Sequence, residues 1–211
     1  MADSDHARDA APAARPGKRE RLVAAAGELV YRQGVARTTL ADIARAADVP
    51  LGNVYYYFKA KDDIVGAVVQ GHVDELASGV AALERRHRTP KARLRALVRV
   101  LAERRDVIAR YGCPYGTLCT ELVKRTDGPD PLAAPLMQVP LRWAERQFRA
   151  MGRRDAHDLA VELVASYQGS AVLSSALGEP ELMTRQARRL ERWIEALDAL
   201  TDPDPKGGSA S

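Results

Sequence analysis

Two groups of side chains in this 211-residue sequence have types and spacings that could carry chemistry. The first is the cysteine pair, Cys113 and Cys119. A cysteine near a helix N-terminus is favoured as a thiolate, and Pro114 suits the first position of such a helix. This pattern indicates an electrophile or redox sensor. The alternative is structural, with Cys113 as a small apolar cap and Cys119 as a buried filler residue.

The second group is a short aromatic and polar segment that begins at Leu51. A helix fits the major groove of DNA, and the side chains at its N-terminal end then meet the base edges. At that end, Asn53 can offer a donor and an acceptor to adenine, Leu51 can lie against a thymine methyl, and Gly52 permits close backbone approach. Tyr55 and Tyr56 supply rings and hydroxyls for methyl or phosphate contacts. The segment therefore predicts a DNA-reading helix.

Other residues around this helix are expected to hold it on the duplex. Thr39 and Lys61 are placed to clamp phosphates on either side, with helix N-termini adding positive ends. Tyr57 is either a core residue or a phosphate contact. The predicted DNA-contacting set is Thr38, Thr39, Arg45, Pro50, Leu51, Gly52, Asn53, Tyr55, Tyr56, Tyr57, Lys59 and Lys61. The residues expected in a miniature core are Leu40, Ile43, Val49, Val54 and Phe58.

The remaining sequence argues against an enzyme. The four histidines show no metal-ligand spacing, and there is no phosphate-cradling loop or nucleophile elbow, so we expect no catalytic residue, metal or cofactor. With 46% apolar and 28% charged residues, the composition is that of a globular protein. No apolar run is long enough to span a membrane, residues 1–18 do not form a secretory signal, and two cysteines fit a reducing compartment. We therefore expect a cytoplasmic protein.

Helical spacing of apolar residues runs through the whole chain, and no strand pattern appears. The fold class expected is all-α, with about nine helices. Leu22, Ala26 and Val30 mark a first helix that Gly34 ends. The further helices are expected at about residues 40–47, 51–57, 62–83, 91–110, 114–125, 131–151, 156–177 and 181–200. The second and third helices, joined by a tight turn, describe a helix-turn-helix unit.

Net charge is only +4, from 32 basic and 28 acidic residues, and alone it does not identify a nucleic-acid binder. Basic residues are concentrated between Arg85 and Arg99. They form either a solvated helix face or a patch that adds to the field felt by a polyanion.

The segment TTLADIARAADVPLGNVYYYFKAKDDI, residues 38–64, resembles the DNA-binding domain of the tetracycline-repressor-like (TetR) family of bacterial regulators. The matching features are the Thr-Thr opening, Ile-Ala in the second helix, Tyr-x-Tyr-Phe at the end of the third, and Lys-x-x-Ile at the start of the fourth. The resemblance covers residues 18–66 closely. Pro50 and Leu51 depart from it, because polar residues are frequent there, and so does Asp48, where glycine is frequent.

The resemblance implies an organisation as well as a function. It implies a tail at 1–17, a helix-turn-helix domain at 18–63, an effector-binding and dimerisation domain at 64–201, and a second tail at 202–211. The tails are expected to be mobile. The partners implied are a double-stranded DNA operator, a second copy of the chain and a small-molecule effector. A homodimer also follows from function, since two recognition helices about one DNA turn apart read a palindrome.

The site residues of the second domain are hypotheses of the same kind. Aromatic, soft or thiol side chains in its helices are candidates for the effector pocket: Tyr111, Cys113, Tyr115, Cys119, Met137, Trp143, Phe148 and Tyr167. Candidates for the dimer interface are Leu159, Leu163, Ser166, Ser170, Leu173, Leu190, Trp193, Ile194 and Leu197.

The function that these patterns favour is a repressor that a small-molecule inducer releases from its operator. One alternative is a thiol-switch regulator that uses Cys113 and Cys119. Another is an all-helical enzyme or ligand carrier with an incidental helix-turn-helix, which no catalytic constellation supports.

Overall fold

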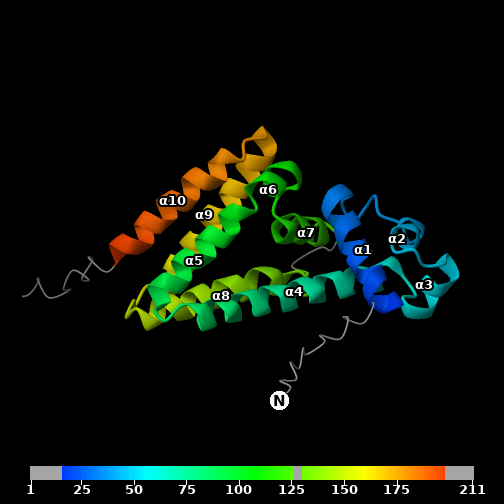
Figure 1. The fold of residues 1–211 in the computed structure, drawn as a ribbon, viewed down its shortest axis with the longest axis horizontal. Helices are drawn as coiled ribbons and strands as arrows, with labels where there is room; N and C mark the ends of the chain where they lie inside the picture. The colour runs from blue at the N-terminus through cyan, green and yellow to red at the C-terminus, as the bar shows by residue number, and fades with distance from the viewer. Residues whose placement is uncertain (1–15, 126–129, 198–211) are drawn as a thin grey trace, which may run out of the picture.

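The N-terminal part of the chain contains four helices, and capping residues mark several of their ends. The computed structural model describes residues 16–125 and 130–197, and Figure 1 shows the helices in order. Helix α1 (Lys18–Gln33) ends at Gly34, whose φ of 84° lies in the left-handed region that glycine adopts readily. The next three helices are α2 (Leu40–Ala46), α3 (Leu51–Tyr57) and α4 (Lys61–Arg86). The expected helix-turn-helix order is present.

The single helix expected at residues 91–110 is instead two. Helix α5 (Pro90–Glu103) and helix α6 (Arg105–Tyr111) are separated at Arg104, whose ψ of 10° leaves the helical range. The break places Ile108 of α6 in a small cluster with Cys113 and Met183. The described residues therefore contain ten helices and no strand, which confirms the all-α class and corrects the count by one.

Four further helices follow in the described part of the chain. They are α7 (Pro114–Val123), α8 (Ala134–Ala150), α9 (Ala156–Leu177) and α10 (Glu181–Ala196). Pro114 takes the first position of α7, as its missing N–H favours, and Gly178 ends α9 in the left-handed conformation. The expected tails, apart from residues 16 and 17, and the expected last turn up to residue 200 lie outside the described residues.

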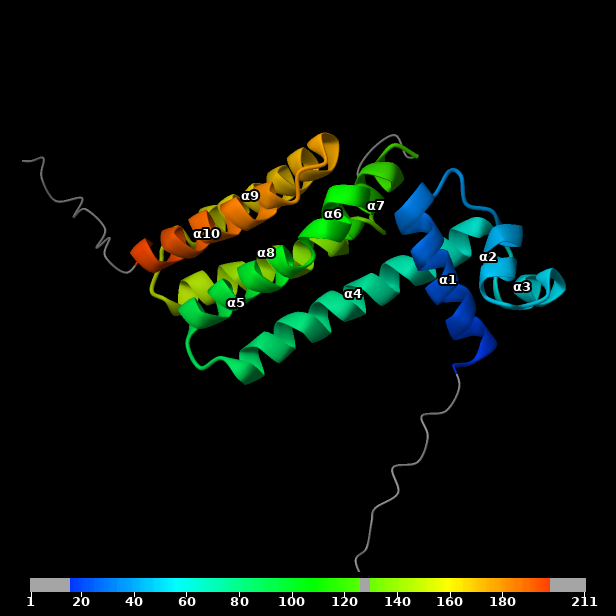
Figure 2. The same ribbon diagram turned by 45° about the horizontal axis from the view of Figure 1, so that its top comes forward.

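Helix α4 runs from the helix-turn-helix into the rest of the chain and belongs to two cores (Figures 1 and 2). Its first half, with Ile64 and Val68, packs with α1–α3 and with Leu118 and Leu122 of α7. Its second half, with Val80, packs with α5, α8, α9 and α10. The core of the first helices thus continues past residue 63 into α7 and α8, so a shift of α7 can reach α1.

The basic segment between Arg85 and Arg99 is partly neutralised by α10. Arg95 pairs with Glu195 at 2.7 Å, and Arg99 pairs with Glu191. These ion pairs support the interpretation of this segment as a helix face rather than a free cationic patch.

Candidate nucleic-acid interface and ligand cavity

The N-terminal half of α3 is presented to solvent. Leu51 is 42% exposed, Tyr55 49% and Tyr56 77%, whereas Val54 on the opposite side is fully buried. Asn53 is half-buried, and no side-chain hydrogen bond occupies its amide in the described structure. An added Cβ at Gly52 would meet no atom within 4 Å. The side chains predicted to read bases are therefore on one open surface.

Helix α3 is held at this angle by the turn before it. The amide of Val49 donates to the carbonyl of Ala44, and Val49 and Phe58 are buried beneath the helix. Asp48 has a φ of 52°, the only positive φ among the described non-glycine residues. That conformation explains why glycine is frequent here in the family that the segment resembles.

Thr39 caps helix α2, and its hydroxyl is already hydrogen-bonded within the chain. Its hydroxyl accepts from the amide of Asp42 at 3.1 Å and donates to the carboxylate of Asp42 at 2.6 Å. The hydrogen bonds that the hydroxyl and the backbone amide of Thr39 donate to the Asp42 carboxylate, aided by the charge of Arg45, hold the pKa of that carboxyl below its usual range. Arg45 pairs with Asp42 but keeps 78% of its side chain exposed, so it can still turn toward a phosphate.

Thr38 corrects the predicted contact set, because it is only 1% exposed. Its hydroxyl donates to the carbonyl of Gly34 at 2.8 Å and accepts from the amide of Gln33 at 3.3 Å. A hydroxyl buried in this way fixes the loop between α1 and α2 and cannot contact a phosphate from where it lies.

Lys61 is a second correction. Its ammonium donates to the carbonyls of Val35 at 2.7 Å and Thr38 at 3.0 Å, with Ala36 at 3.5 Å. An ammonium has three N–H donors, and the three carbonyls occupy them all. Lys61 therefore anchors the α1–α2 loop instead of standing free for DNA.

Two further predicted contacts differ in their surroundings. Tyr57 is half-buried, packs against the core and meets the ring of Tyr56 edge-on at 5.0 Å, which favours its core interpretation. Lys59 is exposed, and its ammonium donates to the carbonyl of Tyr55 at 2.9 Å. Pro50, also exposed, directly precedes α3. Lys59 is thus better placed than Lys61 for a phosphate contact.

Glu121 on α7 contacts the same loop, and no motif or spacing in the sequence pointed to it. Its carboxylate accepts from the amide of Val35 at 2.6 Å, and an added Cβ at Gly34 would come within 3.0 Å of it. At the other end of α7, the hydroxyl of Tyr31 on α1 donates to the carbonyl of Gly112 at 2.9 Å. Both ends of α7 are therefore tied to the first helices.

On the other side of α7 lies a small apolar cavity of about 50 Å³. Tyr115, Met137 and Tyr167, three of the predicted effector residues, line it together. The other lining residues are Leu76, Val80, Leu97, Leu101, Leu136, Pro140, Leu163, Val164 and Gln168. Burial raises the pKa of Tyr115 and of Tyr167, so both hydroxyls keep their proton at neutral pH.

The remaining predicted effector residues lie elsewhere. Trp143 and Phe148 are buried in the core of α4, α5, α8, α9 and α10, where the indole N–H donates to Glu84 at 2.9 Å. Tyr111 packs its ring on Tyr31 at 5.5 Å. The prediction that Trp143, Phe148 and Tyr111 line the effector pocket is therefore wrong for this cavity.

The two cysteines occupy different environments. Cys113 is buried at the N-terminus of α7, where its sulfur accepts from the amide of Gly116 at 3.5 Å and from the Tyr167 hydroxyl at 3.6 Å. Cys119 donates to the carbonyl of Ala133 at 3.4 Å, and burial raises its pKa to about 11. Cys113 thus contacts Tyr167 of the cavity lining but does not itself line the cavity, whereas Cys119 is a protonated filler residue in a core.

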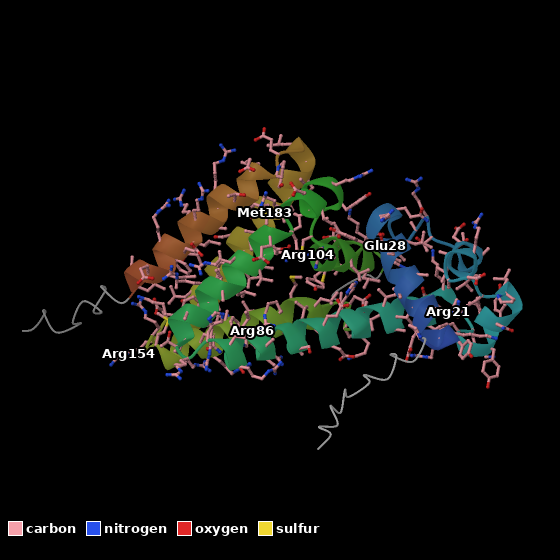
Figure 3. All side chains as sticks on the ribbon, in the orientation of Figure 1. Arg21, Glu28, Arg86, Arg104, Arg154 and Met183 are labelled. Atoms are coloured by element: carbon pink, nitrogen blue, oxygen red, sulfur yellow. The ribbon has the colours of Figure 1, made fainter. Side chains whose placement is uncertain are left out.

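A second hollow lies between α1 and α4 on one side and Arg104 and the start of α7 on the other. It differs from the cavity in carrying charge, from Glu28, Glu75 and Arg104, and Tyr115 is the residue that lines both. Figure 3 shows Glu28 and Arg104 near this junction.

The predicted dimer residues are mostly internal to one chain. Leu159, Leu163, Ser170, Leu190, Ile194 and Leu197 are buried, and Ser166 and Trp193 are half-buried. Only Leu173, at 55%, is exposed. The exposed apolar residues of α9 form another face: Val161, Ala165, Gly169, Val172, Leu173, Ala176 and Leu177. A dimer interface on α9 must use that face, because the buried residues are already covered.

No helix in residues 16–125 or 130–197 combines the length and hydropathy of a membrane span. In the same part of the chain, no three His, Cys, Asp or Glu side chains gather as metal ligands.

Comparison with known proteins places the first helices in a family. Residues 22–68 match the family model described as bacterial regulatory proteins, tetR family. This part of the chain is a tetR-family helix-turn-helix domain. Over a longer stretch, the chain is similar to an uncharacterized HTH-type transcriptional regulator of Lactococcus lactis, with 28% identity over 163 residues, 74% of this chain and 82% of that one.

Two further comparisons agree with this family. The HTH-type transcriptional repressor DhaR of a Mycobacterium species is 29% identical over 168 residues, covering 74% of this chain and 82% of DhaR. A solved TetR regulator from Legionella pneumophila has the same fold, with a TM-score of 0.75 at 17% identity, over 86% of this chain and all of that one. The relatives are transcriptional regulators, and this chain has the all-helical fold of a solved TetR-family regulator.

Proposed function

We propose that this regulator is a repressor that binds a palindromic operator as a homodimer and leaves it when a small molecule occupies the apolar cavity. The observation that carries the proposal is the exposed N-terminal half of α3. Leu51, Gly52, Asn53 and Tyr55 share an open surface although the opposite side of the helix is fully buried. Apolar and aromatic side chains beside a free amide suit thymine methyls and adenine edges in a major groove.

The homodimer is supported by the apolar face of α9. Its members recur at spacings of three, four and seven residues, so they lie on one side of the helix. Val172 is 64% exposed and Leu177 is 61% exposed, while Ala165 and Gly169 would let a second helix approach closely. A second copy would cover this face by the same residues, as a twofold interface requires.

The response to a ligand is supported by the position of α7. Tyr115 of this helix lines the cavity, while Glu121, further along it, holds the amide of Val35 in the loop before α2. A ligand that displaces Tyr115 would move α7 and change the angle of the helix-turn-helix. The ligand can shift this equilibrium only by the difference between its affinities for the two states. The similarity to a named repressor, DhaR, favours repression.

The test is an electrophoretic shift with the intergenic DNA beside the gene for this protein. We expect a complex that contains two chains and that a tenfold excess of random duplex does not remove. A Leu173→Glu variant should be monomeric and lose the complex, because it places a charge in the α9 face. Val100→Glu is the matched control, since Val100 is 45% exposed but lies on α5. Unchanged dimerisation of Leu173→Glu would contradict this interface.

A thiol switch is the second candidate, because Cys113 contacts Tyr167 of the cavity lining and caps α7. Oxidation of Cys113 would disturb the same helix that a ligand would move. The raised pKa of Cys119 weighs against a paired mechanism, since a protonated thiol is a poor nucleophile. A Cys113→Ser, Cys119→Ser double variant that still releases the operator with inducer would favour the ligand mechanism. Loss of all response would favour the switch.

A further inference from the structure

We propose that the effector is an uncharged, mostly apolar molecule that carries one hydrogen-bond-accepting oxygen, such as a ketone carbonyl. This inference rests on the proposed function, in which the cavity beside α7 is the effector site.

The cavity excludes charged ligands by its lining. None of its twelve lining residues is charged at neutral pH. The two tyrosines are the ionisable ones, and burial raises their pKa further above its usual value. A charged group placed there would lose its hydration without gaining an ion pair, and this costs far more than burying a neutral group. The ligand body therefore has to be neutral, and leucine, valine and methionine side chains favour an apolar one.

Two donors in the lining have only sulfur atoms as partners. The hydroxyl of Tyr167 donates to the sulfur of Cys113 at 3.6 Å, and the side-chain amide of Gln168 donates to the sulfur of Met137 at 3.5 Å. Sulfur is a weak acceptor. An oxygen acceptor on a ligand would give either donor a stronger hydrogen bond than it has now, and this selects the polar group of the ligand.

The amide of Gln168 is oriented by a glycine on α7. An added Cβ at Gly116 would lie 2.5 Å from the side-chain oxygen of Gln168. The missing side chain lets that oxygen pack against α7, which leaves the NH2 group on the Met137 side of the cavity. The cavity therefore offers Gln168 as a donor and not as an acceptor.

The second hollow provides the contrast. Glu28, Glu75, His72 and Arg104 line it, so charged compounds have a place to bind outside the cavity. Tyr115 separates the two spaces. A test must therefore show both which compound binds and which side chains it contacts.

The experiment uses four probes on one bicyclic scaffold: 1-tetralone, tetralin, tetralin-1-carboxylate and 1-aminotetralin. Titration calorimetry of the full-length protein gives the affinity for each. We expect 1-tetralone to bind about 3- to 10-fold more tightly than tetralin, the range of one neutral hydrogen bond. The carboxylate and the ammonium compound should bind more weakly than tetralin.

Variants identify the contact. Tyr167→Phe or Gln168→Leu, whichever removes the donor that the carbonyl meets, should reduce or abolish the preference for 1-tetralone over tetralin. Binding of tetralin itself should remain, which shows that the cavity is intact. Tyr111→Phe is the matched control, because Tyr111 packs on Tyr31 and does not line the cavity. It should keep the wild-type preference.

Three results would overturn the proposal: no binding of 1-tetralone or tetralin, tighter binding of a charged probe, or an unchanged ketone preference in both variants. Operator binding without any probe, measured in parallel, tests the proposed function separately. If the operator is bound but the ketone is not preferred, the ligand class is wrong and the regulator stands. If no duplex is bound, the regulator proposal fails whatever the probes do.

Discussion

Replacing Lys61 by alanine separates two roles for the same ammonium group. As a phosphate clamp, Lys61 would contribute to DNA affinity and leave the fold unaffected. In the structure it donates to the carbonyls of Val35 and Thr38, 26 and 23 residues earlier in the chain. We therefore expect Lys61→Ala to destabilise the first helices, because two buried or half-buried carbonyls lose their donor.

The magnitude follows from these contacts. A hydrogen bond to a charged group contributes about 1.5–3 kcal/mol to stability when it is buried. Lys61 is only half-buried, and water can replace part of what the ammonium provides. A loss of about 2 kcal/mol in the free energy of unfolding is the result, which lowers the Tm by roughly 4–8 °C for a chain of this size.

The assay combines thermal unfolding with DNA binding at several salt concentrations. Lys61→Ala should lower the Tm and weaken specific and random DNA without reducing the slope of log affinity against log salt. Lys59→Ala is the matched control, since the Lys59 side chain is exposed and bonds only to the carbonyl of Tyr55. It should keep the Tm and reduce the slope by about 0.9 per chain, as one lost phosphate contact does.

An unchanged Tm for Lys61→Ala, together with a slope reduced by about one unit per chain, would refute this reasoning. Lys61 would then be a phosphate contact whose loop hydrogen bonds contribute nothing to stability.

Three other predictions concern single residues. Asn53→Ala should relax base preference at one position of each half-site by about 1–3 kcal/mol, measured by binding to operators with single substitutions; equal loss for all sequences would contradict a base contact. Asp48→Gly should raise stability by about 0.5–1 kcal/mol in urea unfolding, since it relieves a φ of 52° and loses only an exposed 3.9 Å ion pair with Arg21; a lower stability would show that Asp48 has a structural partner. Cys119 should react with iodoacetamide only as the pH approaches its raised pKa of about 11, and rapid alkylation at pH 8 would contradict its burial. Because the folded chain keeps the thiol proton at a pH where the unfolded chain loses it, the free energy of unfolding should fall from about pH 9 to pH 11.

The helix-turn-helix was predictable because its signals are local. The expected helix at residues 51–57 has the bounds observed for α3, and Val54 and Phe58 lie in the core as their spacing indicated. The roles of Thr38 and Lys61 were not predictable, because they depend on how a loop folds back against a helix more than 20 residues away. The sequence identified the residue types correctly and assigned two of them to the wrong partner.

Which face of α9 is free for the proposed dimer was not predictable from the sequence, because α9 has two apolar faces. Leu159 and Leu163 lie on one, and Val161 and Val172 on the other. Periodicity shows that both faces exist, but only the packing of α5, α8 and α10 decides which one is covered within the chain. The lining of the cavity was predictable only in part. Tyr115 and Tyr167 were chosen because they are aromatic, whereas Gln168 is neither aromatic nor sulfur-containing and was not predicted.

The most direct test of the central claim is a hydroxyl-radical footprint on an operator selected from random DNA, together with the number of chains per duplex. We predict two chains per duplex and two protected half-sites about 10 base pairs apart, both lost when Asn53 and Tyr55 are replaced by alanine. A single chain on the duplex, or a footprint that survives that double substitution, would contradict the account of α3 as the reading helix.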